Sequence, residues 1–215
     1  MSFSEFVYRR INGGFFIIFG TLVSFLFVTV AWIFYIAVDP SFSVFTHWMS
    51  DLGVGPNGSD IIHNTGLYYS SFFTIFSCLY LSFYLEQKGG IKLFNLIALI
   101  PAIISAIGVF FLAVFPIAPG FGPHNIAAGT FFGGIFAFSL AYGIAEYLNP
   151  KISKWFSVSS FISAFFILLY LILCIGPFPV VLAFFSEWLT LVGIGIWVSI
   201  HGILIMRDKS ARGSG

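Results

Sequence analysis

The chain has 215 residues, of which 59% are hydrophobic, 20% are aromatic and only 8% are charged, and its formal net charge is +1 at pH 7. A soluble protein of this size could not cover so much apolar surface with polar groups. A mean hydropathy of +1.03 therefore excludes a soluble globular protein, and we expect no nucleic-acid partner. The composition predicts an integral protein of the cell membrane.

Six apolar stretches follow one another along the chain, and each is long enough to cross a hydrocarbon core of about 30 Å as an α-helix. We expect helices near residues 14–38, 61–85, 93–115, 125–147, 155–175 and 187–206. Barrel strands would alternate in polarity, which these stretches do not. The sequence therefore predicts an all-α, six-helix transmembrane bundle as a single domain over residues 1–209, with a flexible tail at 210–215.

All nine basic residues fall in segments on one side of the predicted membrane. They are Arg9, Arg10, Lys88, Lys92, Lys151, Lys154, Arg207, Lys209 and Arg212. By the positive-inside rule, this side is cytoplasmic. Both termini are thus predicted to be cytoplasmic, and the connections after the first, third and fifth helices should form an extracytoplasmic cap of loops.

Two of the predicted helices carry stripes of small or hydroxylated residues at helical spacing. The second helix has His63, Gly66, Ser70, Thr74 and Ser77, and the fourth has Asn125, Gly129, Gly133, Ala137 and Ala141. Such stripes allow close backbone approach and hydrogen bonds between helices, which lipid does not reward. We expect both stripes to face the interior of the bundle.

The stretch HWMSDLGVGPNGSDIIHN, residues 47–64, gathers acidic and imidazole side chains in a chain that has few of them. Together with the start of the fourth helix it supplies the candidate site residues His47, Asp51, His63 and His124, with Glu187 as an outlying candidate. Histidine and carboxylate are the ligands of catalytic zinc, so these four residues are candidate metal ligands. Without a metal, they could act as general acids and bases on a lipid ester or amide.

Two other readings of these residues remain open. In a structural reading, Asp51 accepts backbone N–H groups and the histidines hydrogen-bond across helix ends. In a redox reading, His63 and His124 ligate haem b from separate helices, and the protein is a noncatalytic subunit, haem- or quinol-binding, of a larger complex. For His201, in the sixth helix, we expect a hydrogen bond within the bundle. A channel or transporter is less favoured, because no charged residue lies at the centre of a predicted helix.

The segments WMSDLGVGP and VFPIAPGFGPHNIAAGTFF resemble the DUF998 family of polytopic membrane proteins, whose domain has no known function. The chain is more distantly similar to the Frag1/DRAM/Sfk1 group, six-helix proteins with an SDTG-type sequence where this chain has Ser50-Asp51-Leu52-Gly53. That group normally has an acidic residue after the following proline, where this chain has Asn57. The distant resemblance implies work on or near membrane lipids.

The leading hypothesis is lipid handling at an extracytoplasmic site, with membrane lipid as the partner. It covers lipid binding, and also hydrolysis or acyl transfer at the membrane interface. In this hypothesis Asp51 orients the substrate or ligates a metal such as zinc, and the three histidines of the site bind the metal or transfer protons.

Overall fold

The computed structural model describes residues 13–118 and 122–208. Over this part of the chain it contains six long α-helices and one short 3₁₀ helix, and it contains no strand. The elements are α2 (Gly13–Ile36), η1 (Met49–Val54), α3 (Ser59–Gln87), α4 (Lys92–Val114), α5 (Pro123–Leu148), α6 (Lys154–Ile175) and α7 (Val180–Arg207). The all-α prediction is confirmed for these residues, and the expected tail at 210–215 lies outside them.

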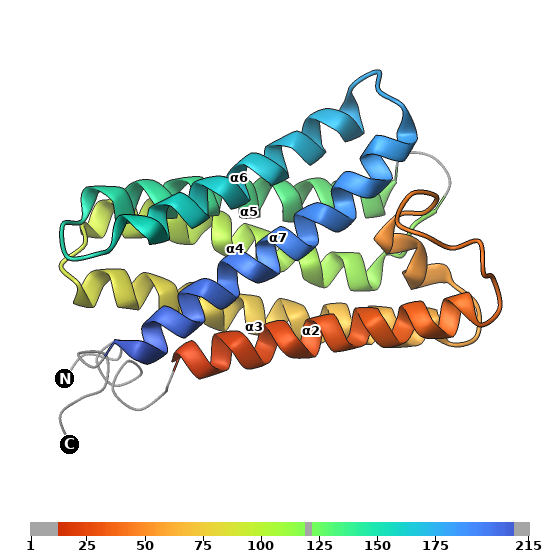
Figure 1. The fold of residues 1–215 in the computed structure, drawn as a ribbon, viewed down its shortest axis with the longest axis horizontal. Coiled ribbons are helices and arrows are strands. Elements are labelled where there is room, and N and C mark those ends of the chain that lie inside the picture. The colour runs from red at the N-terminus through yellow and green to blue at the C-terminus, as the bar shows by residue number, and fades with distance from the viewer. Residues whose placement is uncertain (1–12, 119–121, 209–215) are drawn as a thin grey trace.

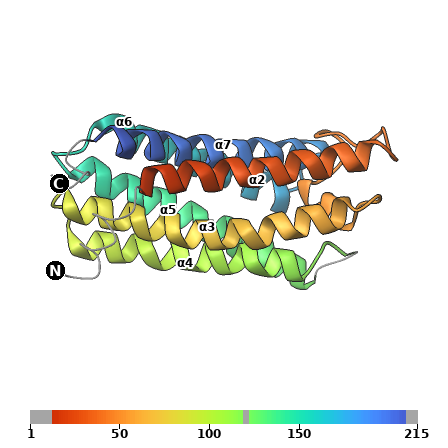
Figure 2. The same cartoon turned by 90° about the horizontal axis from the view of Figure 1, so that it is seen from below.

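The six long helices run lengthwise and alternate in direction (Figures 1 and 2). Each packs against its neighbours in the chain, and α2 also packs against α7, so that the helices close into a ring. One end of the bundle, named here the terminal end, holds the start of α2, the end of α7, and the α3–α4 and α5–α6 connections. The opposite end, named the η1 end, holds η1, which packs against α3, α2 and α7.

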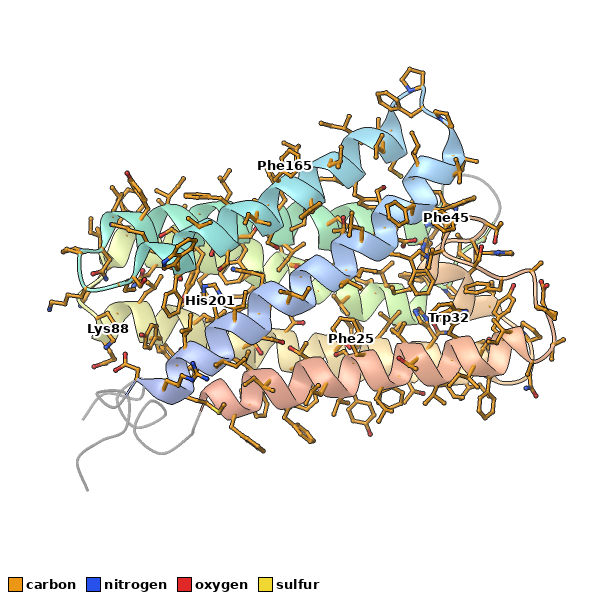
Figure 3. All side chains as sticks on the ribbon, viewed as in Figure 1. Phe25, Trp32, Phe45, Lys88, Phe165 and His201 are labelled. Carbon is orange, nitrogen blue, oxygen red and sulfur yellow. The ribbon has the colours of Figure 1, made fainter. Side chains whose placement is uncertain are left out.

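Five helices, namely α2, α4, α5, α6 and α7, are long and apolar enough to cross a membrane. The remaining one, α3, has 29 residues but a lower mean hydropathy, because polar side chains recur along it. The outside of α3 is nevertheless apolar, since Ile61, Phe72 and Phe76 are exposed there. Large apolar side chains are exposed on all six helices (Figure 3), as expected when lipid and not water surrounds the protein.

The face that α5 turns toward its neighbours differs from the predicted one. A Cβ atom added at Gly134 would lie 2.7 Å from the backbone N of Ser105, so this glycine allows the backbones of α4 and α5 to approach closely. Added at Gly129 or Gly133, a Cβ would have no neighbour within 4 Å. The prediction that these two glycines face the interior was wrong, because the bulky rings of α5, such as Phe138, occupy the interior instead.

The last helix begins seven residues before the predicted start at 187. Pro179 takes the N-cap position of α7, where proline is tolerated because its missing N–H is not needed. Ser186, just before the predicted start, lies inside the helix and donates its hydroxyl to the Ala183 carbonyl. The earlier start places Glu187 two turns into α7, where its side chain is buried.

The tight turn before α3 has two consecutive residues with positive φ, Asn57 at 58° and Gly58 at 81°. Asparagine and glycine are the residues that adopt this left-handed conformation most readily. The Asn57 side chain also donates to the Phe34 carbonyl at the end of α2. This turn connects η1 to α3 and so positions His63, which lies near the start of α3.

Candidate functional site

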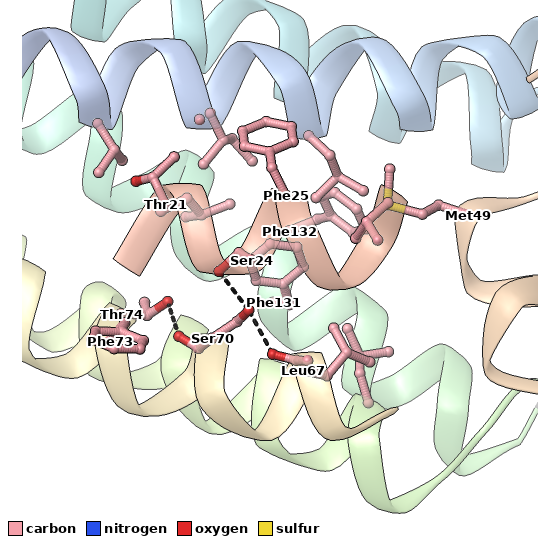
Figure 4. A pocket seen from close by; sticks show the side chains of 18 of the residues that line it. Thr21, Ser24, Phe25, Met49, Leu67, Ser70, Phe73, Thr74, Phe131 and Phe132 are labelled. Carbon is pink, nitrogen blue, oxygen red and sulfur yellow. Dashed lines mark hydrogen bonds between the residues drawn. The ribbon is translucent and has the colours of Figure 1, made fainter. Parts of the chain in front are cut away.

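A cavity of about 210 Å³ lies inside the ring of helices (Figure 4). Its wall is made mostly by α2, α3, α5 and α7, and η1 contributes Met49 and Ser50. Apolar side chains dominate this wall, among them Phe25, Phe131 and Phe132. A cavity between helices of a bundle, largely apolar with a few polar groups, is a typical place for a small ligand.

Hydroxyl groups line one side of the cavity, where α2 faces α3. They belong to Thr21, Ser24, Ser70, Thr74 and Ser77. The Oγ atoms of Ser24 and Ser70 lie 2.7 Å apart and join the two helices (Figure 4). The predicted inward stripe of α3 is confirmed, since His63 and Gly66 line the same cavity as its hydroxyl groups. The lower hydropathy of α3 thus reflects the polar side chains that it turns toward the interior of the bundle.

Two imidazoles, His63 of α3 and His124 of α5, line the cavity toward the η1 end, with exposed fractions of 4% and 8%. The Nδ1 atom of His124 lies 2.9 Å from the Phe115 carbonyl oxygen. Because a carbonyl oxygen only accepts hydrogen bonds, this Nδ1 carries a proton, and in the neutral ring Nε2 carries none. The Nδ1 atom of His63 is buried without a well-aligned hydrogen-bond partner among the described residues, and the ring interacts with the neighbouring Asn64 amide and, electrostatically, with His124.

A carboxylate, Glu187 of α7, completes the polar end of the cavity. It is 6% exposed, and its Oε2 accepts a hydrogen bond from the backbone N–H of Met49 at 2.8 Å. We expected Glu187 only as an outlying candidate of the site. Glu187, Leu191 and Ile194 recur at helical spacing, lie on one face of α7 and all line the cavity. This spacing is the sequence signal for Glu187, but it can be recognised only if the helix is taken to begin before residue 187.

Asp51 does not line the cavity. Its Oδ2 accepts a hydrogen bond from the Trp48 backbone N–H at 2.8 Å and so caps the start of η1. Burial raises the pKa of the Asp51 carboxyl above its ordinary value, against the opposing effects of the Trp48 hydrogen bond and of the nearby His47 and His124. This contact is the one that the structural reading expected for Asp51, namely a hydrogen bond accepted from a backbone N–H. The Asp51 carboxyl is also within electrostatic range of Glu187.

His47 also lies apart from the cavity. Its Nδ1 is 2.8 Å from the Thr46 hydroxyl, its ring stacks on Phe42, and its backbone carbonyl accepts the Trp188 indole N–H. In the part of the chain that the structure describes, no three His, Cys, Asp or Glu side chains are grouped to hold a metal ion. The four predicted ligands are therefore not assembled, because Asp51 and His47 are held by local contacts outside the cavity.

The volume of the cavity bears on the haem reading. An engineered cavity of about 150 Å³ in another protein binds a molecule the size of benzene. A space of about 210 Å³ is only slightly larger and is far too small for a haem. His63 and His124 do share one cavity, as the haem reading expected, but the space between the helices does not fit the macrocycle.

Comparison with known proteins identifies the family of this chain. Neither the curated proteins nor the solved structures contain a match. The model of the family described as "Protein of unknown function (DUF998)" matches residues 21–204. This range runs from the first turns of α2 to the last turns of α7 and includes nearly all of the cavity wall. The chain therefore belongs to the DUF998 family of multi-pass membrane proteins.

Proposed function

We propose that this protein binds one small amphipathic molecule, or one end of a single lipid chain, in the cavity of its helix bundle. The observation that carries this proposal is the uneven wall of the cavity. Imidazole and carboxylate groups line the η1 end, whereas aromatic and aliphatic side chains line most of the rest, apart from the hydroxyl groups where α2 faces α3. The polar head of the ligand would contact His63, His124 and Glu187, and its chain would lie against Phe131 and Phe132.

The size of the cavity limits the ligand. A phospholipid with two chains would need far more than about 210 Å³. A short single-chain molecule fits, since a cavity of about 150 Å³ already holds a six-membered ring. The shared chemistry is therefore one hydrogen-bonding head on one apolar chain, whether the molecule is free or is part of a membrane lipid.

The proposal includes six membrane spans with the site on the extracytoplasmic side. The apolar outer face of α3 supports its placement in lipid beside the five more apolar helices. The described basic residues Lys88, Lys92, Lys151, Lys154 and Arg207 belong to segments at the terminal end. The η1 end holds the acidic residues Asp39, Asp51 and Asp60. Under the positive-inside rule this distribution supports a cytoplasmic terminal end.

A binding experiment with defined probes tests the proposal. The full chain is purified in detergent, and its thermal unfolding is followed with octanoate, octanol or octylamine, which differ only in the head group. A ligand that binds only the folded protein stabilises it by about 2.7 kcal/mol at a hundredfold excess over Kd. We expect at least one of these probes to raise Tm in a saturable manner.

Two neighbouring substitutions on α5 separate cavity binding from general effects of detergent-like probes. Ala128→Phe places a ring in the cavity wall, and Gly129→Phe places the same ring in open space outside it. We expect Ala128→Phe to abolish the shift in Tm and Gly129→Phe to retain it. An equal shift in both variants, or no saturable shift with any probe, would contradict the proposal. If Ala128→Phe alone abolishes the shift, mass spectrometry of molecules that copurify with the chain would show whether the natural ligand is free or part of a lipid.

A further inference from the structure

Apart from the ionisable groups that line the cavity, a pair of ionisable side chains lies inside the bundle near the terminal end. Glu146 of α5 and His201 of α7 are each only 1% exposed, and the Oε1 atom of Glu146 lies 2.8 Å from the Nε2 atom of His201 (Figure 3 labels His201). The prediction that His201 hydrogen-bonds within the bundle is confirmed. Ionisable groups buried among membrane helices are costly and usually mark an ion or proton path.

The hydrogen bonds around this pair determine where most of its protons lie. The Nδ1 atom of His201 is 2.9 Å from the Trp197 carbonyl, so Nδ1 carries a proton. The Trp197 indole N–H donates to the Ser160 hydroxyl oxygen at 2.9 Å. The Ser160 hydroxyl in turn donates to Oε2 of Glu146 at 2.8 Å. These four residues form a closed ring of hydrogen bonds that joins α5, α6 and α7.

One position in this ring is left undetermined, namely the proton between Oε1 of Glu146 and Nε2 of His201. With one proton there, the pair is neutral overall, either as carboxylic acid with imidazole or as carboxylate with imidazolium. Gain of one proton gives the carboxylic acid with imidazolium, and the charge becomes +1. Loss of the shared proton gives carboxylate with neutral imidazole, and the charge becomes −1. Only O–H and N–H bonds form or break in these steps, and the proton is exchanged with water.

This ring of hydrogen bonds adjoins the cavity. Trp197 lines the cavity and also donates to Ser160, so it belongs to both. Tyr142, whose ring packs edge-on against His201, donates its hydroxyl to the carbonyl of Leu81, another residue of the cavity wall. A change of charge at the pair therefore occurs one side chain away from the cavity.

Other titratable groups continue from the pair toward the terminal end. Tyr142 of α5 is within electrostatic range of Glu146 and of Cys78 and Tyr84 of α3. The Tyr84 hydroxyl donates to Asp208 at 2.8 Å, and Lys88 forms an ion pair with the same carboxylate. From α6 the pair is met by the hydroxyl of Ser160. Over their described lengths, α2 and α4 have titratable side chains only near one end, Tyr35 in α2 and the exposed Lys92 in α4.

We propose that the Glu146–His201 pair is a proton-binding site, and that protons move through this pair between the terminal end of the bundle and the cavity. Asp208 and Tyr84 lie on the terminal side of this path, and the Ser160 hydroxyl, which is held in place by the Trp197 indole N–H, lies on the cavity side. At the far end of the cavity, Glu187, His63 and His124 are further proton acceptors. The ligand of this site is the hydrated proton, so the proposal does not depend on the amphipathic ligand.

Infrared spectroscopy tests proton binding directly. The full chain is reconstituted in phosphatidylcholine vesicles and titrated between pH 4 and 10, and the C=O stretch of protonated carboxyl groups is recorded in H₂O and D₂O. We expect a titrating band that is absent in Glu146→Gln and retained in Glu86→Gln, a carboxylate variant at the same end of the bundle. A spectrum in which Glu146→Gln removes no titrating band would overturn the proposal.

A proton-flux measurement separates this role from a purely structural one. Vesicles that contain the protein and a trapped pH-sensitive dye receive a potassium diffusion potential through valinomycin. We expect proton entry well above that of protein-free vesicles, at least tenfold slower in Glu146→Gln, partly restored in Glu146→Asp and unchanged in Glu86→Gln. Equal rates in the wild type and in Glu146→Gln, or no flux above protein-free vesicles, would overturn the path.

A milder variant covers the case in which Glu146→Gln does not fold. Ser160→Ala keeps both members of the pair and removes only the hydrogen bond to Oε2 of Glu146. In the protonated acid, Oε2 of Glu146 then lacks its hydrogen-bond donor, so the C=O stretch of the titrating band should move to higher frequency. A folded Ser160→Ala protein in which this band keeps its wild-type frequency would overturn the proposal.

Discussion

The carboxylate of Glu187 in α7 accepts the backbone N–H of Met49 at 2.8 Å, and this bond joins the last long helix to η1 over one end of the cavity. Both residues are buried and both line the cavity. A single contact between segments 138 residues apart in the sequence thus closes the η1 end of the bundle and places an acidic group inside it.

Glu187→Leu should destabilise the protein. The substitution leaves the Met49 N–H buried without its acceptor, and an unsatisfied buried donor costs about 1–3 kcal/mol. The measurement is the thermal unfolding of the purified chain in detergent. Glu86→Leu, which changes a half-exposed carboxylate that forms a long ion pair with Lys92, serves as the control and should change stability by less than about 0.5 kcal/mol. Equal effects of the two substitutions would show that the contact with η1 contributes little.

The titration of Asp51 should reduce stability as the pH rises. Burial raises the pKa of Asp51 in the folded protein above its ordinary value of 3.8, so the folded state binds more protons than the unfolded state between the two pKa values. The contribution of Asp51 is therefore largest below pH 3.8 and is lost as the pH rises through the folded pKa. Asp51→Asn should remove this part of the pH dependence of unfolding.

Asp39 provides a comparison of opposite sign. The hydroxyl of Ser41 donates to its carboxylate and lowers the pKa of Asp39 below 3.8. Its favourable contribution is therefore present above the ordinary pKa and is lost as the pH falls through the folded pKa. Unfolding curves of Asp39→Asn and Asp51→Asn should differ from those of the wild type in opposite directions with pH. Shifts in the same direction would show that the environment of one carboxyl differs from the one described.

Two adjacent glycines of α5 should respond oppositely to substitution by alanine. At Gly134 the new methyl group would lie 2.7 Å from the Ser105 backbone N, so α4 and α5 must separate, and overpacking typically costs about 1–3 kcal/mol. At Gly133 the methyl group meets no atom within 4 Å, and alanine is the better helix former by up to about 1 kcal/mol. Thermal unfolding of both variants checks this prediction. Destabilisation by Gly133→Ala would show that this face contacts another chain.

The Glu146–His201 contact should appear as strong energetic coupling in a double-mutant cycle. Removing one member of a buried pair leaves the other without its partner and typically costs about 3–5 kcal/mol. We therefore expect His201→Ala and Glu146→Ala each to lower stability severely, and the double substitution to cost much less than the sum of the two. Additive losses, measured by unfolding in detergent, would contradict a direct interaction.

Composition and local periodicity were sufficient to predict a membrane protein made of long helices. Apolar stretches of spanning length can be recognised residue by residue, because lipid imposes the same demand on each helix separately. The inward stripe of α3 followed in the same way, since Gly66, Ser70 and Thr74 recur at helical spacing and all line the cavity. The resemblance to the DUF998 family also rested on short segments of sequence, and the family match over residues 21–204 bears this resemblance out.

Which charged groups meet was decided only by the tertiary structure. Asp51 stands in the most polar segment of the chain, yet it caps η1, whereas Glu187 in an apolar stretch lies at the cavity. Glu146 finds His201 at a separation of 55 residues because α5 and α7 turn these side chains toward each other. The rotation of each helix about its axis depends on the packing of all its neighbours at once, and bulky rings such as Phe138 take the interior positions first. Spacing within one helix specifies a face, but only the closed ring of helices determines what that face meets.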